Sequence, residues 1–191
     1  MRVLIRSLDA RVSPANFAWL GLRLEGEQLA LYSETRSLVE SKVGPLVGGS
    51  PSVIVLQLGP VVPLSEVDEI SHKVAPMVES AQGLTIKPRR VAYFNPGKLH
   101  GTKLVVEYDS RSLGKLHTRM LRGLASHVSV DLFPTFRAHV TLGYCDGELT
   151  LDQKRSLKDV PMSESEWSPA SILLHRGHDI VRAYSLTEDS A

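Results

Sequence analysis

The chain has 191 residues, of which 42% are hydrophobic and 23% are charged. This composition is typical of a globular protein that can bury a sizeable core. Its 22 basic and 21 acidic residues give a formal net charge of +1, which excludes a polybasic nucleic-acid binder. Any anion-binding site therefore has to be local.

The single cysteine, Cys145, excludes an intrachain disulfide and a cysteine-rich zinc site. The N-terminal residues lack the apolar run of a signal peptide, and no stretch approaches the ~20 apolar residues of a transmembrane helix. The sequence also lacks the motifs of P-loop, dinucleotide-binding, zinc-protease and α/β-hydrolase sites. We therefore expect a cytoplasmic protein that makes no membrane contact.

Hydrophobic spacing predicts alternating strands and helices in the first half of the chain. Strands are expected at residues 2–8, 18–24 and 52–59, and helices at residues 28–43 and from residue 63 onward. Pro76 is expected to kink or end the second helix, because proline lacks the amide hydrogen that a helix interior needs.

The second half repeats this order of elements. We expect strands at residues 85–94 (interrupted at Pro88) and 103–108, a helix capped at residues 109–110, an extended segment at 128–133, a strand at 136–144, a helix at 151–160 and a hairpin of residues 171–174 and 180–186 around the turn at 176–179. Strands separated by helices, together with hairpins, predict an α+β fold with mixed or antiparallel sheets.

The strand at residues 136–144 carries the most informative pattern. Val140 and Leu142 alternate with His139 and Thr141, so one face is apolar and the other carries an imidazole and a hydroxyl. This pair suits a phosphate, because the imidazole can move a proton and the hydroxyl can bond a non-bridging oxygen. The alternative is a half-exposed strand that carries polar residues without a function.

His139, Thr141 and Leu142, with Phe136 before them, resemble the second His-x-Thr motif of the 2H phosphoesterase superfamily. This superfamily includes the bacterial enzymes called 2′-5′ RNA ligases or RNA 2′,3′-cyclic phosphodiesterases. Residues 52–59, which end in Leu-Gly, occupy the place of the first motif strand, and the C-terminal hairpin matches the last two strands of the family. The resemblance covers most of residues 50–188.

The resemblance implies a fold of two pseudo-symmetric lobes around a central groove. Each lobe would be a small, mostly antiparallel sheet with flanking helices. Residues 1–191 would form one domain, with approximate lobes at residues 1–85 plus 170–188 and at residues 86–169.

The resemblance also implies a hydrolase that needs neither metal nor cofactor. In the family one histidine acts as the general base, the other protonates the leaving oxygen, and the two threonines hold the phosphate. The substrate would be a cyclic or 2′-linked phosphodiester of RNA or of a nucleotide. The expected catalytic residues of this chain are His139 and Thr141.

The first motif departs from the family pattern. Aligned on the Leu-Gly end of the strand, Ser52 stands where the first histidine is expected, and Ile54 stands where the first threonine is expected. Serine does not exchange protons near neutral pH, and isoleucine cannot bind phosphate. Half of the acid–base pair is therefore missing under this alignment. The alternative function is a catalytically degenerate 2H fold that binds a nucleotide, RNA or a partner protein.

Two residues are candidates for the opposite side of the site, Ser52 and His100. His100 belongs to a second His-x-Thr sequence, but it lies too close to His139 along the chain for a fold with one motif in each half. Arg137, His175 and Arg176 are candidates for substrate binding through their positive charge, although each could instead be an ordinary surface residue.

Overall fold

The computed structural model describes residues 17–60, 64–94, 101–127, 136–177 and 179–187. The elements are β1 Phe17–Arg23, α1 Gly26–Val43, β2 Ser52–Pro60, α2 Leu64–Glu79, β3 Lys87–Phe94, β4 Thr102–Asp109, α3 Arg111–Gly123, β5 His139–Cys145, α4 Leu151–Ser156, the 3-10 helix η2 Leu157–Asp159, β6 Ser171–Arg176 and β7 Asp179–Ser185. The predicted α+β class is confirmed. The segments expected at residues 2–8 and 128–133 lie outside the described residues.

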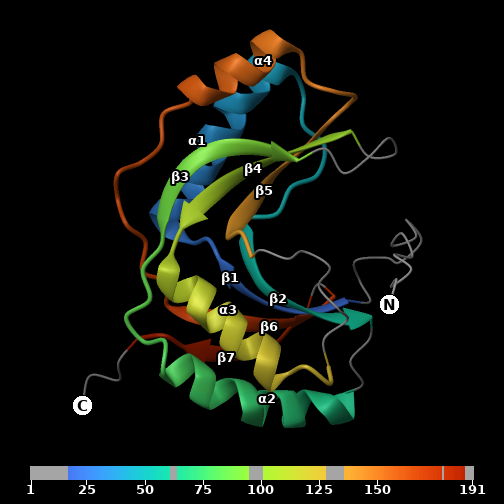
Figure 1. Cartoon of the computed structure of the whole chain (residues 1–191), viewed down its shortest axis with the longest axis vertical. Helices are drawn as coiled ribbons and strands as arrows, with labels where there is room; N and C mark the ends of the chain where they lie inside the picture. The colour runs from blue at the N-terminus through green and yellow to red at the C-terminus, as the bar shows by residue number, and fades with distance from the viewer. Residues whose placement is uncertain (1–16, 61–63, 95–100, 128–135, 178, 188–191) are drawn as a thin grey trace, which may run out of the picture.

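The strands form two antiparallel sheets (Figure 1). The first sheet has four strands in the order β2-β1-β6-β7, and the second has three in the order β3-β4-β5. The C-terminal hairpin β6–β7 pairs with β1, so the first sheet combines strands from both ends of the described chain. Strands β2 and β5 are edge strands of different sheets, and they contact each other.

The helices cover the two sheets in a crossed arrangement. Helix α1 follows β1 in sequence but packs against β5 and α4, in the upper half of Figure 1. Helix α3 follows β4 but packs against β2 and α2, in the lower half. Each sheet is therefore covered by a helix that the chain adds after a strand of the other sheet.

The sequence of α3 explains its position. Leu113, Leu116 and Met120 recur at helical spacing and are buried, so they form the face that packs on the first sheet. The hydroxyl of Ser110 accepts a hydrogen bond from the amide of Leu113 at 3.1 Å, which confirms the predicted N-terminal cap.

One apolar cluster fills the space between both sheets and their helices. Leu20 and Leu22 of β1 and Val140 and Leu142 of β5 are fully buried members of it. The predicted alternation along β5 is therefore confirmed over residues 139–142. The shared core fixes the two sheets relative to each other, because close-packed interiors resist deformation.

Two local boundaries differ from those expected. Helix α2 does not end at Pro76 but continues through it to Glu79, because Val74 and Val78 are buried on either side of the proline and keep this turn packed. Strand β5 starts at His139 instead of residue 136, and a register shift in the β4–β5 pairing coincides with Gly143, whose φ is 152°. Tyr144 consequently leaves the apolar face and is 38% exposed.

A short segment before β2 joins the two sheets. Val47 pairs with Tyr144, and Ser50 pairs with Thr141, each as an isolated antiparallel bridge. The amide of Ser50 donates a hydrogen bond to the carbonyl of Thr141 at 2.8 Å, and the hydroxyl of Tyr32 on α1 donates to the same oxygen at 3.0 Å. These bonds explain why β2 and β5 lie side by side although they belong to different sheets.

Gly49 permits this close approach. Its φ is +120°, and a Cβ atom there would lie 2.7 Å from the carbonyl oxygen of Leu142 and 2.8 Å from the Tyr32 hydroxyl. The guanidinium of Arg36 would be equally crowded, at 2.7 Å. Only glycine fits this position without moving the segment or β5.

We therefore expect Gly49→Ala to destabilise the fold by ~1–3 kcal/mol through backbone strain, with a further cost from the clash. Gly114→Ala is the matched control, because Gly114 lies on α3 with nothing within 4 Å of an added Cβ, and alanine there should stabilise the helix by ~0.5–1 kcal/mol. Urea unfolding of both variants measures the two effects. Equal stability changes of the same sign would contradict this account of Gly49.

Candidate active site

His139 lies at the start of β5 with both ring nitrogens engaged. Its Nδ1 is 2.8 Å from the carbonyl oxygen of Arg137, and its Nε2 is 3.0 Å from the ammonium of Lys103 on β4. A carbonyl can only accept, so Nδ1 carries the proton and donates it. Nε2 then presents its lone pair to the ammonium, which donates to it. The ring is held in the tautomer in which Nε2 can accept a proton.

The surroundings of His139 favour its neutral form. Burial lowers the pKa of the imidazole, the positive charge of Lys103 lowers it further, and the Arg137 carbonyl and Glu107 act in the opposite direction. Burial also lowers the pKa of the Lys103 ammonium. A neutral imidazole near pH 7 is a competent general base.

Beside His139, Glu107 forms ion pairs with Arg90 and Arg137 that the sequence analysis did not predict. It pairs with His139 across β4 and β5, is only 7% exposed, and accepts a hydrogen bond from the Nε of Arg90 at 2.7 Å. Its other carboxylate oxygen lies 3.7 Å from the Arg137 guanidinium. Arg137 therefore shares the His139 region as expected, but its charge is directed partly to Glu107. The available signal was the pair of charged residues, Lys103 and Glu107, that flank the apolar residues 104–106 of β4.

Ser52 stands at the junction of the two sheets. The bridges Val47–Tyr144 and Ser50–Thr141 share one antiparallel register, and the same register continued along both strands puts Ser52 opposite His139. Ser52 is 9% exposed.

On the other side of β2, Ser52 is paired with Arg23 of β1. Ile54 is 37% exposed and pairs with Gly21. The position at which the sequence resemblance expects a histidine thus holds a hydroxyl, and its partner on β1 is an exposed arginine.

His175 is more buried than expected for a residue next to a hairpin turn. Its ring stacks on Trp19 with centroids 3.7 Å apart and planes at 4°, and it is 7% exposed. Its Nε2 has no hydrogen-bond partner within the part of the chain that the structure describes. Burial, and then the charge of Arg23, lower its pKa, so the ring is neutral near pH 7. Arg176 is half-buried at the end of β6.

The predicted site residues thus fall into two groups. His139, Thr141 and Arg137 lie together on or beside β5, with Ser52 across the junction from them. His175 and Arg176 lie on β6, which is separated from Ser52 by β1. His100 lies outside the described residues.

No cluster of three or more potential metal ligands occurs within residues 17–60, 64–94, 101–127, 136–177 and 179–187. No helix in these ranges is both long and apolar enough to cross a membrane.

Neither models of protein families nor curated protein sequences match this chain. Solved structures do match it. TT0787 of Thermus thermophilus superposes with a TM-score of 0.69 at 16% identity, covering 91% of this chain and 99% of that one. E. coli LigT complexed with 3′-AMP superposes with a TM-score of 0.64 at 14% identity, covering 91% and 99%.

Kluyveromyces marxianus Usb1 with uridine monophosphate superposes with a TM-score of 0.54 at 13% identity, covering 90% and 99%. These three structures belong to the 2H phosphoesterase superfamily. The chain has the 2H phosphoesterase fold. The expected two-lobed architecture is therefore confirmed.

The contact between Lys103 and His139 gives a direct prediction. The imidazole should titrate below the ordinary histidine pKa of about 6.5, and Lys103→Met should raise its pKa because the neighbouring positive charge is removed. Nitrogen-15 NMR titration of the His139 ring measures both values. Lys158→Met, an exposed position on η2, is the control that should leave the titration unchanged. An unshifted His139 pKa in Lys103→Met would contradict the contact.

Proposed function

We propose that this protein is a metal-independent phosphodiesterase that hydrolyses a cyclic or 2′-linked phosphodiester of RNA or of a nucleotide. The observation that carries the proposal is the neutral His139 ring, oriented by the Arg137 carbonyl, on the strand that also holds Thr141. The 2H fold supports it as well, because the neighbours LigT and Usb1 were solved with nucleotides bound.

In the proposed reaction the phosphodiester lies between β5 and β2. A water molecule displaces the Lys103 ammonium from Nε2 of His139, and Nε2 takes a proton as the water oxygen bonds to phosphorus. Lys103 and the Thr141 hydroxyl then donate hydrogen bonds to the non-bridging oxygens, where negative charge develops. The bond from phosphorus to the 2′ or 3′ oxygen breaks, and that oxygen leaves with the electron pair.

The leaving oxygen must gain a proton, and here the site is weak. Ser52 does not exchange protons near neutral pH, and the guanidinium of Arg23 serves as a hydrogen-bond donor and a positive charge. We therefore assign to this side phosphate binding by the Arg23 charge and the Ser52 hydroxyl, with the leaving oxygen protonated by solvent. The loss of a positioned general acid costs ~10²–10⁴-fold in rate.

The second candidate function is binding without turnover. Ser52 and Ile54 favour it, because they replace one proton donor and one phosphate ligand, whereas Lys103, Thr141 and Arg23 can still hold a phosphate. The two functions differ in one observable, hydrolysis of a bound 2′,3′-cyclic phosphate.

The test is hydrolysis of an RNA that ends in a 2′,3′-cyclic phosphate. His139→Gln should lower kcat/KM by ~10²–10⁴-fold, because the general base is lost. Thr141→Val keeps the β-branched shape and should mainly weaken substrate binding, seen as a raised KM. His72→Gln, an exposed histidine on α2, is the control and should behave like the wild type.

Turnover that survives His139→Gln would refute the assignment of the base. Absence of turnover in the wild type, together with nucleotide binding that is lost in Thr141→Val, would establish the binding function instead.

A further inference from the structure

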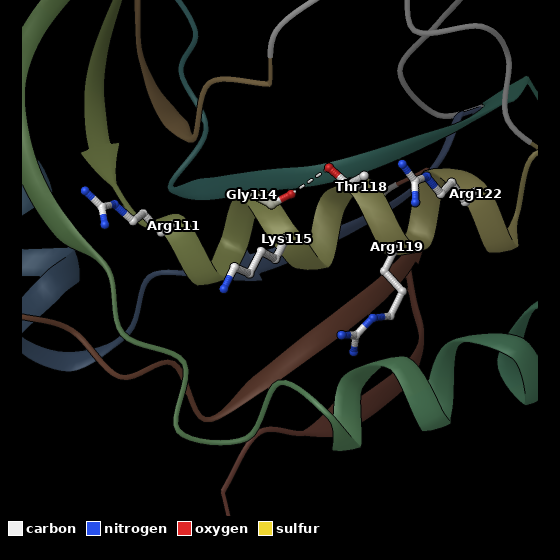
Figure 2. Close-up of a pocket in the computed structure, with 6 residues that line it drawn as sticks. All are labelled: Arg111, Gly114, Lys115, Thr118, Arg119 and Arg122. Carbon is white, nitrogen blue, oxygen red and sulfur yellow. Dashed lines mark hydrogen bonds between the residues drawn. The ribbon is translucent and has the colours of Figure 1, made fainter.

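Helix α3 has a second face that the candidate active site does not use. It borders a shallow hollow of about 610 Å³, lined by Arg111, Gly114, Lys115, Thr118, Arg119 and Arg122 (Figure 2). Four of these six residues are cationic. We call Arg111, Lys115, Arg119 and Arg122 the α3 basic row.

Among the residues that the structure describes, no carboxylate forms an ion pair with the α3 basic row. The helix itself contains no acidic residue, and none lines this hollow or the adjoining one that shares Lys115 and Arg119. Across the described ranges, every ion pair of an arginine or lysine involves residues other than these four. A chain with a net charge of +1 thus concentrates on one helix face four cations that have no ion-pair partner within the described ranges.

The spacing of the row is unfavourable for the isolated protein. Arg111, Lys115 and Arg119 follow one another at i,i+4, and like charges at this spacing destabilise a helix by ~0.2–0.5 kcal/mol per pair. The charges also form a line, with a rise of ~6 Å along the helix axis from one to the next. A linear polyanion can neutralise all of them together, whereas a small anion can reach only one or two.

We propose that the α3 basic row binds the phosphate backbone of single-stranded RNA, while one phosphodiester of the same RNA is hydrolysed between β2 and β5. This inference rests on the proposed function. Three of the four cations are arginines, whose planar guanidinium bonds two phosphate oxygens at once. An anionic membrane is the poorer fit. A helix that lies on a membrane inserts apolar side chains, and none of the large exposed apolar residues in the described ranges is on α3.

Helix α3, which carries the α3 basic row, is fixed to the strands of the candidate active site. From the buried face of α3, the Nδ1 of His117 donates to the carbonyl of Val55 on β2 at 2.6 Å. The same ring stacks on Phe136 with centroids 4.2 Å apart, three residues before His139. At its other end α3 directly follows β4, which carries Lys103. RNA held along α3 is therefore positioned relative to β2 and β5, the two strands of the candidate active site.

The experiment compares two variants that each lose four charges. The test variant replaces Arg111, Lys115, Arg119 and Arg122 by glutamine. The control variant replaces Lys42, Lys154, Arg155 and Lys158, which lie on α1, α4 and η2, by glutamine. Helices α1 and α4 are in the upper half of Figure 1, away from α3. Fluorescence anisotropy measures the binding of a labelled single-stranded RNA of about a dozen nucleotides with a 3′-phosphate, over a range of salt concentrations.

For the test variant we expect at least a tenfold loss of RNA affinity at low salt. The slope of log K against log salt should fall by ~0.7 for each lost phosphate contact, or ~3 for all four. Hydrolysis of a 2′,3′-cyclic mononucleotide should stay at the wild-type value, because a mononucleotide does not reach the row. Thermal unfolding followed by circular dichroism should show a protein at least as stable as the wild type, since like-charge repulsion along α3 is removed.

Equal loss of affinity and of salt dependence in both variants would overturn the proposal, because net charge alone would then explain binding. Binding of phosphatidylserine vesicles in preference to the RNA would overturn it as well. If the wild type binds RNA through the row but hydrolyses no cyclic phosphate, the row stands and the proposed catalysis fails.

Discussion

The backbone carbonyl of Thr141 joins the two halves of this molecule. It accepts hydrogen bonds from the Ser50 amide at 2.8 Å and from the Tyr32 hydroxyl at 3.0 Å. Strands β2 and β5 lie at the edges of different sheets, so no regular sheet pairing connects them. The position of His139 relative to Ser52 depends on this junction, and the junction in turn depends on Gly49, which leaves room for it.

The two sides of the junction differ in chemistry. The β5 side has an imidazole oriented by a backbone carbonyl, an ammonium in contact with it and a hydroxyl, whereas the β2 side has the hydroxyl of Ser52, which is paired with Arg23 of β1. Binding a phosphate requires charge and hydrogen-bond donors, and both sides supply them. Fast hydrolysis also requires a proton for the leaving oxygen, and only an imidazole or a similar group supplies it near neutral pH. Under the proposed function, this asymmetry should therefore reduce turnover more than it reduces binding.

The sequence was sufficient for the parts of this account that rest on periodicity and spacing. It predicted β2, β5 and the cap at Ser110, because these follow from alternation, helical spacing and local hydrogen bonding. It could not predict Lys103 as the partner of His139, since that contact depends on the register between β4 and β5. It also left His175 as a candidate surface residue beside the hairpin turn, because no local pattern indicates that Trp19, far away in sequence, covers its ring.

The most direct test of the proposed function introduces on β2 the histidine and threonine that the resemblance to the 2H family led us to expect there. The double variant Ser52→His and Ile54→Thr should hydrolyse a 2′,3′-cyclic nucleotide ~10²-fold faster than the wild type, because it regains a general acid. Its gain on a p-nitrophenyl phosphodiester should be small, since that leaving group departs without a proton. A double variant that gains nothing on the cyclic nucleotide, although it folds and binds as the wild type does, would contradict the proposed roles of the two strands.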